Sequence, residues 1–168
     1  MVEGRTLTEL VDRDFHGARW RQRFGRLVAR LRGRAAPGRL ACFAEERGGK
    51  TIVNRRSLGI QTVELAKIEG SVGRCRDFDR AFMPVCSCRG ERWKRVGKAL
   101  REGKQLPPIK LYKLGGQYFV EDGNHRVSVS RYRGFLSIEA EVTELLDIGA
   151  ATIGLGDETR DRKSGGRR

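Results

Sequence analysis

Apolar residues recur at helical spacing near the start of the chain, between Thr8 and Arg32. Most of them lie three or four residues from the next, as on one face of an α-helix: Leu10, Trp20, Phe24, Leu27, Val28 and Leu31. The other faces are rich in arginine: Arg19, Arg21, Arg23, Arg26 and Arg30. The pattern predicts a basic amphipathic helix. We expect its apolar stripe to pack on the core, and its arginines could lie along nucleic acid at the same time; a helix that lies on a membrane surface is the alternative.

The next segment, residues 33–59, has no sustained hydrophobic period and contains Pro37 and several glycines. This composition is typical of connecting segments. We therefore expect a linker with at most short structure and a domain boundary near Gly59.

Beyond Gly59 the pattern becomes regular and predicts a domain over residues 60–146. The expected elements are a strand near 63–68, a helix over 91–102, a hairpin of strands 109–114 and 118–121, a helix over 125–133 and a strand near 138–142. Gly115-Gly116 supplies the hairpin turn, because glycine adopts positive φ without steric cost. Residues 147–168 are rich in glycine and charge and predict a flexible tail.

The charge balance indicates a polyanionic partner. The chain carries 35 lysines and arginines against 21 acidic residues, and residues 1–59 hold 14 of the basic and six of the acidic groups. Nucleic acid, a nucleotide or an anionic membrane surface would attract such a chain. Because no apolar run approaches the roughly 18 residues that a membrane span needs, we expect a soluble, cytoplasmic protein without a membrane span.

Four cysteines, Cys42, Cys75, Cys86 and Cys88, occur in the chain. In a cytoplasmic protein they would be reduced thiols rather than a disulfide framework. Zinc binding by Cys75, Cys86 and Cys88 with His125 is a weaker alternative, because their spacing is not that of common zinc motifs.

The sequence Asp122-Gly123-Asn124-His125-Arg126 joins the second hairpin strand to the following helix. A glycine at this junction leaves backbone N–H groups free at the positive end of the helix dipole, which favours a phosphate. Arg126 could bind that phosphate bidentately, His125 could donate to it, and Asp122 could bind an accompanying metal. The alternative is an ordinary turn with a solvated arginine.

The order of these elements resembles the ParB/sulfiredoxin superfamily over about half of the chain. In that family a Pro-Ile pair begins the strand before Tyr-x-Val-x-x-Gly-x-x-Arg, and here Pro108-Ile109 precedes Tyr118, Val120, Gly123 and Arg126. The resemblance implies an α+β fold with a small mixed sheet and packed helices, here with a basic N-terminal helix added. It also implies that the glycine-arginine turn binds nucleotide phosphates, with Ser71 and Arg74 of the loop after the first strand as further candidates.

Departures from the family pattern narrow the expected activity. Asn124 stands where sulfiredoxins have their catalytic cysteine, and an amide cannot act as a thiolate nucleophile. ParB clamps have a glutamate at that position and a following helix-turn-helix region, which we do not find here. Neither sulfiredoxin activity nor a partition-type DNA clamp is therefore expected.

We expect a ParB-like nucleotide-binding protein, a regulator or a DNA-associated accessory factor. Gly123, Asn124, His125 and Arg126 would hold a nucleoside triphosphate whose base the sequence does not specify, with magnesium as its metal. The alternative is a small kinase or nucleotide hydrolase, with Asp122 assisting the metal and Glu69 or Glu121 as base. A third hypothesis is a sequence-independent DNA- or RNA-binding module that uses residues 8–32. The sequence does not indicate an oligomeric state.

Overall fold

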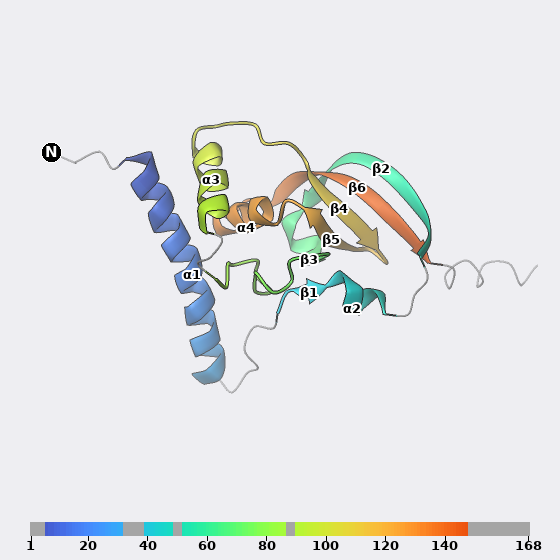
Figure 1. Ribbon diagram of the computed structural model, residues 1–168, viewed down its shortest axis with the longest axis horizontal. Helices are drawn as coiled ribbons and strands as arrows, with labels where there is room; N and C mark the ends of the chain where they lie inside the picture. The colour runs from blue at the N-terminus through green and yellow to red at the C-terminus, as the bar shows by residue number, and fades with distance from the viewer. Residues whose placement is uncertain (1–5, 32–38, 49–51, 87–89, 148–168) are drawn as a thin grey trace, which may run out of the picture.

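The computed structural model describes residues 6–31, 39–48, 52–86 and 90–147 (Figure 1). The expected tail, apart from Asp147, lies outside the described residues. The elements are α1 (Leu7–Leu31), β1 (Ala41–Cys42), α2 (Phe43–Arg47), β2 (Ile52–Glu64), the 3-10 helix η1 (Leu65–Lys67), β3 (Ile68–Ser71), α3 (Gly90–Arg101), β4 (Ile109–Leu114), β5 (Gln117–Asp122), α4 (Asn124–Tyr132) and β6 (Ser137–Asp147). The predicted α+β class, with a small mixed sheet and packed helices, is confirmed.

Six strands form one mixed sheet in the order β1-β3-β5-β4-β6-β2. The pairs β1 with β3, β3 with β5 and β4 with β6 are parallel, whereas β4 with β5 and β2 with β6 are antiparallel. The predicted hairpin is β4 and β5, and its turn residues Gly115 and Gly116 have φ values of 56° and 89°. The hairpin places the end of β5 in the interior of the sheet, where α4 begins.

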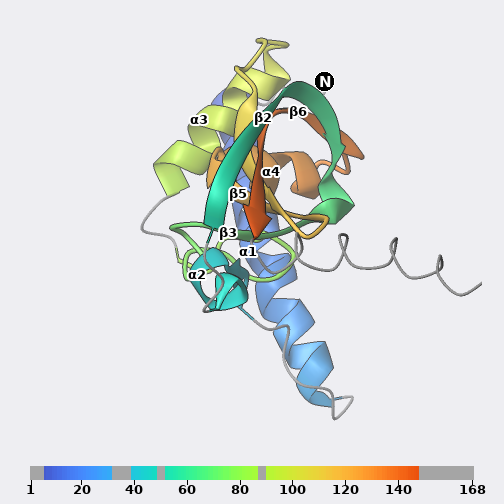
Figure 2. The same ribbon diagram turned by 90° about the vertical axis from the view of Figure 1, so that its right-hand side faces the viewer.

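The helices α1, α3 and α4 form layers on one side of this sheet, with α4 between the sheet and the pair α1 and α3 (Figures 1 and 2). Val127 of α4 packs into the main sheet core, while Val129 packs with Phe15 of α1 and Trp93 of α3. On the other face of the sheet, Phe43 of α2 contacts Phe119 of β5. Consequently α4 is fixed from both sides, which positions its N-terminus.

The helix predicted over residues 8–32 is α1, but its expected packing was wrong. The side chains that face the core are Val11, Phe15 and Ala18, which are no more than 4% exposed. The apolar stripe that defined the prediction is largely exposed instead: Trp20 61%, Phe24 47%, Leu27 52% and Leu31 78%. The apolar spacing therefore identified the helix but not the face that packs. Within the described residues, no helix is long and apolar enough to cross a membrane.

The expected domain boundary near Gly59 falls inside β2. Gly59 has a φ of 72° and lies at a register shift of the β2–β6 ladder, so it is a bulge glycine rather than the end of a linker. Residues assigned to that linker also belong to the core, since Leu40 is 1% exposed and Phe43 is 8% exposed. Whether residues 60–146 fold alone stays a prediction.

The expectation of reduced thiols was wrong. Cys42, at the end of β1, forms a disulfide with Cys75, and their Cα atoms are 5.2 Å apart. Cys86 is also disulfide-bonded. Because the Cys42–Cys75 bond joins β1 to the loop after β3, it brings a segment that looked like a linker against the sheet. Sequence spacing could not reveal this proximity.

Candidate functional site

The junction between β5 and α4 is a left-handed turn that requires glycine. Gly123 precedes the helix with φ 106° and ψ 18°. A Cβ at this position would overlap the side chain of Ile109 in β4, so a larger residue would push the two segments apart. No side chain of the described residues caps α4 at Gly123. The first backbone N–H groups of α4 are therefore available to an anion.

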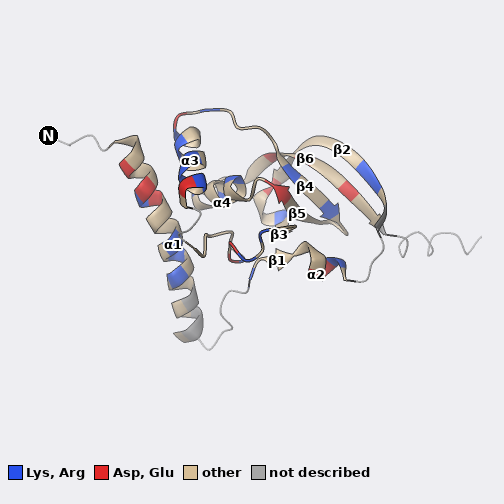
Figure 3. Ribbon diagram, in the orientation of Figure 1, with Lys and Arg blue, Asp and Glu red and all other residues tan. Residues whose placement is uncertain are grey.

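A pocket of about 430 Å³ lies at this helix start. Three segments line it: the β5–α4 junction, α3, and the loop after β3. Its lining residues are Arg74, Arg92, Arg95, Val96, Glu121, Asp122, Gly123, Asn124, His125 and Arg126. Figure 3 shows the basic residues along α3, which faces this junction across the pocket. The pocket is thus lined by four arginines and two carboxylates, and the dipole of α4 adds to its positive potential.

Two residues of the first turn of α4 bring unpaired polar atoms to the pocket. Asn124 is 5% exposed, and its Oδ1 atom has no hydrogen-bond partner among the described residues. Both ring nitrogens of His125 are buried and likewise lack a partner in the described chain. Buried polar atoms are nearly always paired in folded proteins. These atoms therefore indicate a place that a ligand or water completes.

His125 is held neutral by its surroundings. Burial lowers its pKa to about 4, and the positive charges of Arg74 and Arg92 add to this effect, while Asp77 opposes it. The ring also packs edge-on against Phe78, with ring centroids 5.3 Å apart. A neutral imidazole offers one donor and one acceptor, so His125 can orient a ligand without carrying a charge.

Arg92 and Arg95 of α3 are the site residues that the sequence reasoning missed. Both side chains are exposed, and neither forms a hydrogen bond or ion pair with the part of the chain that the structure describes. Their spacing of three residues puts them on one helical face, which was visible in the sequence. The direction of that face depends on how Trp93 docks α3 against α1 and α4.

Arg126 lines the pocket, but its guanidinium is already engaged. Nη1 donates to the backbone oxygens of Pro107 and Pro108, and Nη2 pairs with Asp122 at 2.6 Å. The Arg126 side chain is 14% exposed, whereas that of Asp122 is 70% exposed. Arg126 therefore braces the segment before β4 against the turn, and Asp122 is its ion-pair partner.

Of the other predicted site residues, some line the pocket and one positions a loop beside it. Glu121 lines the pocket and accepts a hydrogen bond from the Tyr112 hydroxyl at 2.7 Å. Arg74 lines it as well, with an ion pair to Asp77 at 3.2 Å. Ser71 is fully buried; its hydroxyl donates to the Val120 oxygen and accepts from the Arg74 N–H, so it positions the Arg74 loop.

Glu69, proposed as a base, does not line this pocket. Its charge instead acts on Arg131, where it opposes the lowering of the pKa by burial. Among the described residues, no group of three or more His, Cys, Asp or Glu side chains could hold a metal ion. Of the carboxylates proposed for catalysis, the pocket therefore contains Glu121 and Asp122.

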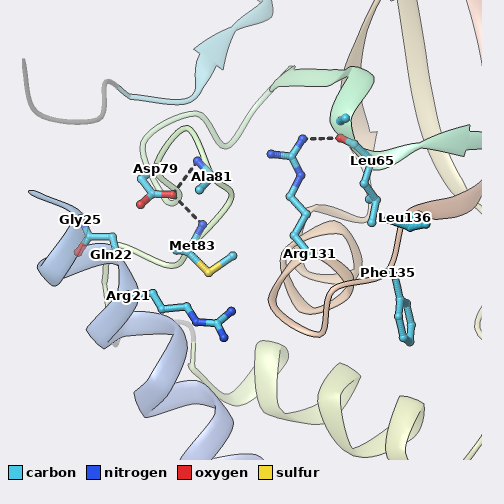
Figure 4. Close-up of a pocket in the computed structure, with 11 residues that line it drawn as sticks. Arg21, Gln22, Gly25, Leu65, Asp79, Ala81, Met83, Arg131, Phe135 and Leu136 are labelled. Atoms are coloured by element: carbon cyan, nitrogen blue, oxygen red, sulfur yellow. Dashed lines mark hydrogen bonds between the residues drawn. The ribbon is translucent and has the colours of Figure 1, made fainter. Parts of the chain in front are cut away.

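A second pocket, of about 510 Å³, lies near the other end of α4 (Figure 4). Arg131 reaches from α4 to the backbone oxygens of Leu65 and Ile68, and its guanidinium lies 4.7 Å from the Phe82 ring centroid. Asp79 accepts hydrogen bonds from the backbone of Ala81 and Met83. The charged groups of this pocket thus support the backbone around it.

Comparisons with known proteins gave one structural similarity. No family model and no curated protein sequence matches the chain. A solved structure, sulfiredoxin from Arabidopsis thaliana, is similar at 22% sequence identity with a TM-score of 0.38. The match covers 49% of this chain and 82% of that chain.

Proposed function

We propose that the pocket at the start of α4 binds the phosphate groups of a nucleotide. The observation that carries this proposal is the meeting of buried, unpaired atoms of Asn124 and His125 with two unpaired arginines, Arg92 and Arg95. The free N–H groups of α4 and the arginine side chains would share the phosphate oxygens. Gly123 adopts the left-handed turn that places these N–H groups at the pocket.

A nucleotide suits the mixed chemistry of the pocket better than a simple anion. Phosphate oxygens accept hydrogen bonds from the arginines, but the Oδ1 atom of Asn124 is an acceptor and needs a donor. Ribose hydroxyls and base N–H groups are such donors. The pocket volume of about 430 Å³ lies in the usual range for small organic ligands.

The wider role that we propose is that of a regulator or DNA-associated accessory factor. The net charge of +14 supports contact with nucleic acid. Such contact would be independent of sequence and would weaken steeply as salt increases. Fluorescence anisotropy with two unrelated DNA duplexes tests this role; a strong preference for one duplex or a weak salt dependence would contradict it.

Nucleotide hydrolysis or phosphoryl transfer is a second candidate, favoured by the two carboxylates in the pocket. Glu121, held by Tyr112, is the candidate base, and exposed Asp122 is the candidate partner for a nucleotide-bound magnesium ion. Turnover of nucleoside triphosphates, measured as phosphate release, distinguishes this candidate from binding alone. Glu121→Gln should abolish release and leave nucleotide affinity within about twofold, because it keeps a side chain of the same shape.

Calorimetric titration with ATP, GTP, CTP and UTP in the presence of magnesium tests the binding proposal. The variant Arg92→Ala/Arg95→Ala should weaken nucleotide binding about 100-fold, since each charge-assisted contact contributes about 1.5 kcal/mol or more. Its unfolding midpoint should not change, because both side chains are exposed. Arg56→Ala is the control: Arg56 pairs with Glu144 on the β2–β6 ladder, and its side chain is 66% exposed. Equal affinity of both variants would place the phosphate site elsewhere.

A further inference from the structure

Two opposite faces of α1 are apolar, and the structure covers one of them. Val11, Phe15 and Ala18 form the covered face, which packs toward α3 and α4. Trp20, Phe24, Leu27 and Leu31 form the second face, which we call the exposed seam. At about 100° per residue the centres of the two faces lie roughly 180° apart. The exposed seam therefore points away from the protein core.

The exposed seam has the spacing of a coiled-coil contact. Its residues follow one another at intervals of four, three and four positions, which is the a/d pattern of a heptad repeat. The seam is about 60° wide and about 17 Å long at the usual helical geometry. Trp20 and Phe24 stack on each other, with ring centroids 4.7 Å apart and an interplanar angle of 12°. The seam is thus a narrow, continuous apolar ridge.

We propose that the exposed seam binds an acidic amphipathic helix of another protein. In a heptad with Trp20 and Leu27 at d, Arg21 and Arg23 occupy flanking e and g positions. Arg23 is exposed beside the seam. The Arg21 guanidinium lies over the Tyr132 ring, 4.6 Å from its centroid, and donates to the Tyr132 backbone oxygen, so Arg23 is the flank that is open to a partner. Basic flanks select a partner helix whose own flanking positions are glutamate or aspartate.

The arginines disfavour a second copy of the chain as occupant, and the width of the seam disfavours a bilayer. A second copy of the chain would bring identical arginines together and add another net charge of +14. Binding to a bilayer surface grows with the apolar area that is buried in it, and the seam is only about 60° wide. An acidic helix matches both the narrow seam and its basic flanks.

Trp20 makes docking directly measurable. The chain has two tryptophans, of which Trp93 is 1% exposed and Trp20 is 61% exposed. The probes are two helical peptides of about three heptads with leucine at a and d, one with glutamate and the other with lysine at e and g. The glutamate peptide should shift Trp20 emission to the blue with saturation, and added salt should weaken binding. The Trp20→Phe variant should bind but show no shift.

Leu27→Asp should reduce affinity for the glutamate peptide at least tenfold, because it puts a carboxylate into the seam. The matched control is Leu136→Asp, which changes a leucine that is 86% exposed away from the seam and should bind like the parent. Far-ultraviolet circular dichroism should show unchanged helix content in both variants. Four outcomes would overturn the proposal: no binding of the glutamate peptide, equal binding of both peptides, a dimer in light scattering, or an equal blue shift with anionic phosphatidylserine vesicles.

Discussion

The pockets near the two ends of α4 contain the same kinds of residue in opposite states. Near the end of α4, Arg131 and Asp79 are paired with backbone groups of the surrounding loops. At the start of α4, Arg92 and Arg95 are unpaired within the described chain, and polar atoms of Asn124 and His125 are buried without partners. Charged residues therefore stabilise the fold in one pocket and are available to a ligand in the other.

Gln22 is the exception that limits this contrast. Its Nε2 atom is buried and has no partner among the described residues, although Gln22 lines the pocket near the end of α4. A single ordered water can accept the hydrogen bond of one such donor. At the start of α4 the unpaired atoms include both ring nitrogens of His125, which point in different directions, so one water cannot reach them together. The number and arrangement of unpaired groups, rather than the presence of arginine, distinguish a binding site from a supporting one.

The largest expected effect comes from removing the Cys42–Cys75 disulfide, which links β1 to the loop that carries Arg74. The two cysteines are 33 residues apart in the sequence, and a loop of this length corresponds to about 3–4 kcal/mol of stability. Cys42→Ser/Cys75→Ser should lose that amount in urea denaturation at pH 7. It should also weaken nucleotide binding, because the Arg74 loop loses its tether. Unchanged stability would mean that the two cysteines are not bonded in solution.

Arg131→Ala should destabilise the backbone around the pocket near the end of α4 and leave nucleotide binding unchanged. The change removes donors from the backbone oxygens of Leu65 and Ile68, and the expected loss of stability is about 2–3 kcal/mol. Nucleotide affinity, measured well below the unfolding transition, should stay within about twofold of the parent because Arg131 lies outside that pocket. A large loss of affinity in the folded variant would contradict the division between the pockets.

Arg126→Ala tests the comparison further, because Arg126 lines the nucleotide pocket and also supports the backbone around it. From the sequence we predict lost nucleotide binding and unchanged stability. The structure changes the second expectation. Because the variant loses the hydrogen bonds of Arg126 to Pro107 and Pro108 and its ion pair with Asp122, we expect the free energy of unfolding to fall by about 1–2 kcal/mol. Arg126→Lys should recover part of both, since lysine cannot reproduce the planar fork. If the folded alanine variant is less stable but binds nucleotide with the affinity of the parent, Arg126 has a structural role and does not contact the ligand.

The last prediction concerns an effect that is confined to acid pH and depends on His125. Its pKa is lowered to about 4 in the folded chain, from an ordinary value of 6.5, so the unfolded chain binds more protons between these values. The His125 contribution is complete above pH 6.5 and is lost as the pH falls toward 4. The stability of His125→Gln should therefore depend less on pH in this window than that of the parent. The measurement is urea denaturation of both proteins at pH 7, 5.5 and 4.5. If the free energy of unfolding falls equally in the parent and in His125→Gln, His125 is protonated as readily in the folded chain as in the unfolded chain.

Much of the local structure was predictable because it depends on neighbouring residues. The hairpin at Gly115-Gly116, α3, α4 and the final strand follow from hydrophobic periods and turn residues. The turn at Gly123 was also predictable, because a glycine between a strand and a helix marks a backbone with positive φ. The prediction of a domain boundary at Gly59 was wrong, since a glycine at a bulge inside a strand and a glycine at the end of a linker give the same signal in a single sequence.

By itself, the sequence determined the helices α1, α3 and α4, the β4–β5 hairpin, the final strand, the strong positive charge, and the position of the β5–α4 junction. Tertiary structure decided which face of α1 is covered, that β1 and β2 complete the sheet, and that Cys42 meets Cys75. It also turned Arg92 and Arg95 toward the α4 N-terminus and engaged Arg126 with Pro107 and Pro108. Periodicity reports on residues within a turn or two, whereas these contacts depend on the direction in which packed elements meet.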